Sequence, residues 1–84
     1  MELTREIALT IAKNPDENLL VESSKSKESG KFSATLALTR FGIRHGVLLS
    51  TQPAFETAKQ AEDCIREVIQ IVRKSNKDAL KGGR

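Results

Sequence analysis

Residues 32–51 read FSATLALTRFGIRHGVLLST, and this stretch decides the fold. In residues 32–39 apolar side chains alternate with small polar ones, and a second alternating run extends over residues 43–51. A period of two is typical of a β-strand that buries one face. The two runs therefore predict an antiparallel hairpin with its tip at Phe41-Gly42. Because a positive φ is unfavourable for Phe, we expect either a longer loop of the same parity or a turn that places Gly42 at the special position.

The pairing of the two strands follows from the position of the tip. Counting outward from it, Leu36 faces Val47 and Ala34 faces Leu49. The same parity places Ile43 on the apolar face together with Val47 and Leu49. The hairpin is therefore predicted to present one apolar face to a second layer.

A helix follows the hairpin. Between Ala58 and Val72 the apolar residues lie three and four apart, which places them on one face of a helix. Thr57 and Gln60 form a capping box that puts the helix start near Thr57. The helix is predicted to end near residues 75–76 and to run back across the sheet toward the hairpin tip.

Two segments precede the hairpin. Residues 19–24 form a shorter strand, joined to the hairpin by a loop rich in Ser and Lys. Residues 3–13 fit two structures, because their apolar residues have helical spacing, with Thr4 as a cap, and also alternate as in a strand. The fold class is therefore α+β: a two-layer antiparallel meander sheet of three or four strands packed by one C-terminal helix.

Composition limits the kind of protein. The chain has 84 residues, 38% of them apolar, and a formal net charge of +3. We expect one domain over residues 1–75 and a basic, flexible tail over residues 76–84. The single Cys64 lies in the apolar stripe of the helix, which favours a buried, inert thiol. One cysteine, no signal-peptide core and no membrane-length apolar run together predict a cytoplasmic protein without a membrane partner.

The positive charge is concentrated near the end of the chain. Residues 73–84 carry five basic residues and one acidic residue, whereas residues 1–72 carry nine basic and ten acidic residues. The antiparallel course of the helix predicts that Arg73 and Lys74 emerge beside the hairpin tip and form one basic end with it. Asp16 is expected near the same end.

The hairpin tip combines two guanidinium groups, an aromatic ring and an imidazole, which suit contact with phosphates and stacking on an unpaired base. The predicted function is a small non-catalytic module that binds the backbone of DNA or RNA. The candidate nucleic-acid-binding residues are Arg40, Phe41, Arg44, His45, Arg73, Lys74 and Lys77. No pattern of catalytic, cofactor-binding or metal-binding residues is present, and no small-molecule substrate is inferred.

A second function is compatible with the same fold. The outer face of the predicted hairpin carries mostly small Ser, Thr and Ala side chains, which allow another chain to approach closely. A sheet covered by one helix also leaves edge strands open. The alternative is therefore a protein-interaction or homodimeric module that uses this face or an edge strand.

The order of elements over residues 17–69 resembles the double-stranded-RNA-binding domain, more so if residues 3–13 are helical. The stretches that resemble this family are NLLVE, GKFSATL and AKQAE, at residues 18–22, 30–36 and 58–62. That family begins its last helix with adjacent lysines that bind phosphates, whereas this chain has only Lys59 there, flanked by acidic residues. The strand and helix order also resembles the amino-terminal arm-type DNA-binding domain of tyrosine recombinases. Both resemblances imply nucleic-acid binding.

Overall fold

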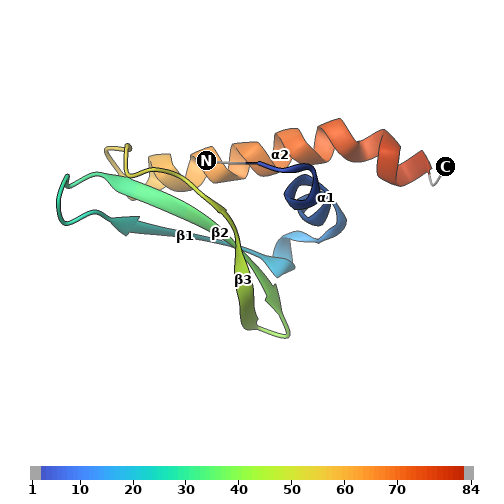
Figure 1. Cartoon of the computed structure of the whole chain (residues 1–84), viewed down its shortest axis with the longest axis horizontal. Coiled ribbons are helices and arrows are strands. Elements are labelled where there is room, and N and C mark those ends of the chain that lie inside the picture. Colours follow the sequence, from blue (N-terminus) through green and yellow to red (C-terminus); the bar gives the residue numbers. More distant parts are fainter. Residues whose placement is uncertain (1–2, 83–84) are drawn as a thin grey trace.

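The computed structural model describes the backbone of residues 3–82 and the side chains of residues 3–76 (Figure 1). The elements are α1 (Arg5–Lys13), the short 3₁₀ helix η1 (Asp16–Asn18), β1 (Leu19–Lys25), β2 (Phe32–Arg40), β3 (Ile43–Ser50) and α2 (Ala58–Gly82). The strands form an antiparallel sheet in the order β1-β2-β3, and α2 packs against it. The predicted two-layer α+β fold is confirmed, with a three-stranded sheet.

The core lies between α2 and one face of the sheet. The stripe on α2 is buried at Ala61, Ile65, Ile69 and Val72, as its spacing predicts. The sheet and α1 contribute the rest of the buried cluster: Ile11, Ala34, Leu36 and Leu49. Because only three aromatic residues occur in the chain, this core is aliphatic.

The ambiguous N-terminal segment is a helix. Thr4 Oγ1 accepts a hydrogen bond from the Ile7 amide at 3.1 Å, which is the expected N-cap. The helix ends at Lys13, because Pro15 disfavours a helical conformation of Asn14. Ile11 is fully buried in the core cluster, so tertiary packing selects the helix over the strand.

The start of α2 agrees with its capping box, but its end does not agree with the prediction. Thr57 Oγ1 accepts from the Gln60 amide, and Gln60 Oε1 accepts from the Glu56 amide, both at 3.1 Å. The predicted end near residues 75–76 is wrong, since the helical backbone continues to Gly82. The Asn76 side chain donates to the Val72 carbonyl at 2.9 Å and does not cap the helix, and the following residues are mostly good helix formers. Residues 83–84 of the predicted flexible tail lie outside the described residues.

The predicted hairpin register holds only near the tip. Arg40 pairs with Ile43 as expected, but two β-bulges follow, and His45 and Leu48 are the extra residues of β3. Leu36 therefore faces Leu49, and the predicted pairing with Val47 is wrong. Each bulge interrupts the alternation of side chains along β3. Val47 lies between the two bulges and is therefore turned to the outer face, where it is 55% exposed, whereas Leu49 follows both bulges and is buried as predicted. Ile43 precedes both bulges and is 66% exposed because it lies at the tip that projects away from α2 (Figure 1).

Ion pairs cover the exposed side of α2. Lys59 Nζ lies 2.9 Å from Asp63 Oδ2, and Arg66 pairs with Glu62 at 3.3 Å and with Asp63 at 3.1 Å. Opposite charges three and four residues apart face each other on a helix, so these pairs stabilise α2 locally. Asp63 accepts from two cations and is the centre of this network.

Asp63 is expected to contribute to the acid sensitivity of the protein. Its pKa is lowered below the ordinary value of 3.8, chiefly by the hydrogen bond from Lys59. A lowered folded-state pKa stabilises the fold above pH 3.8, and this contribution is lost as the pH falls through the folded-state pKa. Asp63→Asn should therefore reduce the fall in stability at acidic pH, measured by urea unfolding over a pH series. Gln70→Asn, a change at an exposed position of α2 that removes no ionisable group, should leave that fall as it is in the wild type. An unchanged pH profile in Asp63→Asn would contradict the assignment.

Candidate nucleic-acid interface

The β2–β3 hairpin tip, residues 40–45, projects from the sheet on the side away from α2 (Figure 1). Of the two turns expected, the longer loop is absent, and Gly42 has the positive φ expected of the other. Phe41 and Gly42 form a two-residue turn with φ values of +54° and +75°, and a positive φ at both central residues is typical of a type I′ turn. Phe41 itself takes the left-handed conformation, and its side chain is 99% exposed.

The hairpin carries positive charge without nearby acidic residues in the sequence. Between Glu28 and Glu56 the chain has no Asp or Glu. Among the side chains of residues 3–76, none forms an ion pair with Arg40. Arg44 reaches across the outer face of the sheet, where its Nη1 lies 3.0 Å from Glu22 Oε1. Both side chains of this pair are more than 40% exposed, so the pair is weak and easily exchanged for another anion.

His45 and Cys64 differ from their predicted environments. His45 has the same parity as Ile43 and Val47, which places it on the predicted apolar face, but as the extra residue of the first bulge it is exposed beside Arg44. Cys64 was expected to be buried and is half-buried on α2. Within the described part of the chain, no three His, Cys, Asp or Glu residues are grouped so as to hold a metal ion.

The predicted single basic end is not formed. The hairpin tip points away from the carboxyl-terminal part of α2, and α1 lies beside that part instead (Figure 1). Arg73 packs on the α1 side, where it pairs with Asp16 at 2.6 Å and donates to the Asn14 carbonyl at 2.8 Å. Lys74 is exposed on α2, and the side chain of Lys77 lies outside the described residues. Arg40, Phe41, Arg44 and His45 therefore form a site of their own.

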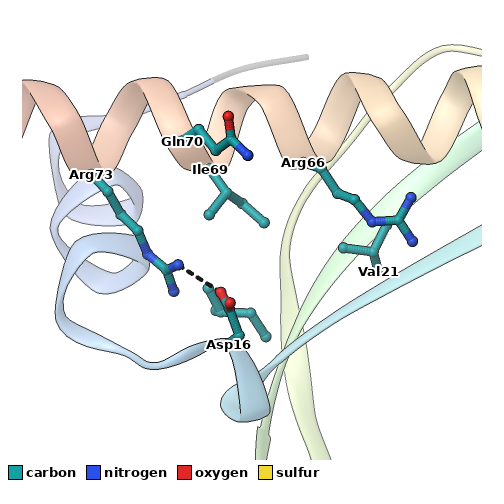
Figure 2. A pocket seen from close by; sticks show the side chains of 7 residues that line it. Asp16, Val21, Arg66, Ile69, Gln70 and Arg73 are labelled. Carbon is teal, nitrogen blue, oxygen red and sulfur yellow. Dashed lines mark hydrogen bonds and ion pairs between the residues drawn. The ribbon is translucent and has the colours of Figure 1, made fainter.

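A groove of about 380 Å³ lies between η1, β1 and α2 and was not found from the sequence. Figure 2 shows Arg73 reaching down to Asp16, with Ile69 between Arg73 and Arg66. Each of the two arginines already has a carboxylate partner in the chain. The groove therefore has no unneutralised cation for an anionic ligand. The seven-residue spacing of Arg66 and Arg73 places both on one side of α2. The partners of Arg66 lie one turn away on the same helix, whereas the partner of Arg73 is brought to it from η1 by the fold.

Comparison with protein-family models, curated proteins and solved structures found no match to this chain. The helical N-terminal segment gives the described chain the order helix, three strands, helix, with the short η1 after the first helix. None of the helices in the described region has the length and apolarity needed to cross a bilayer.

Proposed function

We propose that the protein binds nucleic acid through the β2–β3 hairpin, with Arg40 and Arg44 contacting phosphates. The observation that carries the proposal is the exposure of these two arginines on a projecting ribbon that has no acidic residue of its own. Contacts from Arg to phosphate position a protein on the backbone without reading the sequence. A two-stranded ribbon has the dimensions to enter the major groove of B-DNA.

The ion pair between Glu22 and Arg44 is weak enough for a phosphate to replace the Glu22 carboxylate at the Arg44 guanidinium. A surface pair of this kind contributes about 0–1 kcal/mol, so a phosphate competes readily with the carboxylate. The guanidinium then gains an anion that accepts two parallel hydrogen bonds. Glu22 thus acts as a competitor for the proposed ligand.

The salt dependence of binding tests the proposal. Two phosphate contacts predict that the logarithm of the binding constant falls with a slope of about −1.8 against the logarithm of salt concentration for B-DNA. This slope corresponds to a loss of roughly tenfold between about 50 and 200 mM salt. Fluorescence anisotropy with labelled DNA and RNA probes, duplex and single-stranded, measures it. The double variant Arg40→Ala, Arg44→Ala should lose most of the affinity and of the slope.

Two further variants separate local from general charge effects. Glu22→Gln should raise the affinity, because it frees Arg44 without adding a cation. Lys74→Ala removes a positive charge from α2, away from the hairpin, and should change the affinity less than twofold, about 0.4 kcal/mol. A loss in Lys74→Ala as large as the loss in the double arginine variant, or no binding by the wild type at low salt, would refute the proposal.

Protein interaction through the sheet is the second candidate, and one observation favours it. On the outer face Leu20, Ala37 and Val47 are cross-strand neighbours, and Leu20 and Val47 remain 39% and 55% exposed. β1 and β3 are both edge strands of the sheet. A second copy of the chain could cover this apolar row. A dimer that persists at high salt in light scattering, with no nucleic-acid binding, would select this candidate over the first.

A further inference from the structure

The presence of phenylalanine at position 41 is not explained by the stability of the fold. Among the described residues Phe41 is the only one other than glycine with a positive φ. The left-handed conformation is unfavourable for a side chain with a Cβ, and Asn, Asp or Gly normally occupies this position of a type I′ turn. A core contact does not compensate for this strain, because the ring is 99% exposed. A residue that strains the backbone and makes no packing contact to offset the strain is a candidate functional residue.

The position of the Phe41 ring relative to Arg40 and Arg44 indicates which part of a nucleic acid the ring contacts. Phe41 lies at the outermost point of the hairpin, and Arg40 and Arg44 lie behind it, one on each strand. When the two guanidinium groups lie against phosphates, the ring extends beyond them toward the bases. An aromatic ring at this level is able to stack on a base face.

We propose that Phe41 stacks on an unpaired base, so that the hairpin prefers nucleic acid with a bulged or single-stranded base over a continuous duplex. This inference rests on the proposed function, because the arginines supply the contacts that hold the ring in place. In a continuous duplex both faces of each base are covered by their neighbours, and a ring enters only by unstacking them. At an unpaired base that cost is lower, which gives the preference.

The experiment compares two probes that differ by one nucleotide. One probe is a perfect duplex, and the other contains a single bulged 2-aminopurine, whose fluorescence reports stacking. Both are prepared as DNA and as RNA. Wild-type protein should bind the bulged probe about tenfold more tightly, which corresponds to ~1.4 kcal/mol, and should change the 2-aminopurine signal.

Phe41→Asn removes the ring and places at this position a residue that the turn accepts. This variant should lose the tenfold preference and the 2-aminopurine response, while its affinity for the perfect duplex stays within twofold. Phe41→Trp, the conservative variant, should keep both. Ile71→Asn, a matched change at an exposed apolar position of α2, should behave as the wild type. A melting temperature of Phe41→Asn at or above the wild-type value shows that the hairpin is folded.

The outcomes separate this inference from the proposed function. Equal binding of the two probes by the wild type, or a preference retained in Phe41→Asn, overturns the role of the ring and leaves the arginine contacts standing. Absence of binding to every probe at low salt overturns the proposed function itself.

Discussion

Replacing Ile65 by Ala is expected to lower the free energy of unfolding by about 2–5 kcal/mol. Ile65 is fully buried at the centre of the α2 stripe, where it packs with the sheet residues of the core cluster. The substitution removes buried methyl groups and leaves a cavity that the surrounding side chains fill only in part. For a small domain with a total stability of about 5–15 kcal/mol, this loss is a large fraction.

Ile71→Ala is the matched control for this experiment, since it makes the same chemical change on the same helix. Ile71 is 56% exposed, so its replacement should change the stability by about 0.5 kcal/mol or less. Urea unfolding followed by circular dichroism measures both variants. Equal effects at the two positions would show that α2 does not bury this face against the sheet.

The fold was predictable in the segments where the spacing of apolar residues along the sequence indicates one type of secondary structure. The change from a period of two in the hairpin to three and four in α2 defined both layers and the buried stripe. The bulges in β3 were not predictable in this way, because nothing in the local sequence marks His45 and Leu48 as the extra residues of bulges. Their effect is large, since they leave Val47 on the exposed side of the sheet.

The candidate site was predictable only as far as it is local. Arg40, Phe41 and Arg44 lie close together in any tight hairpin, and the structure keeps them together. The predicted contribution of Arg73 depended instead on how the hairpin and α2 sit relative to each other. In the structure the tip points away from α2 (Figure 1), and the Arg73 guanidinium is bound instead by Asp16 and the Asn14 carbonyl, next to α1.

The second large effect is expected for Ile11→Ala, which tests why residues 5–13 form a helix. Their spacing fits a strand as well as a helix, and a nine-residue helix is marginally stable on its own. Packing of Ile11 into the cluster formed by α2 and the sheet therefore provides the stabilisation. Removing it should lower the free energy of unfolding by about 2–5 kcal/mol and reduce the hydrogen-exchange protection of the α1 amides.

Leu3→Ala provides the comparison at the same end of the chain. Leu3 is 44% exposed and precedes the Thr4 cap, so its loss should change the stability by about 0.5 kcal/mol or less. If Ile11→Ala is no more destabilising than Leu3→Ala, α1 is not held by the core. In that case the placement of Asp16 next to Arg73, and with it the separation of Arg73 from the hairpin arginines, loses its structural basis, because η1 follows α1 directly in the chain.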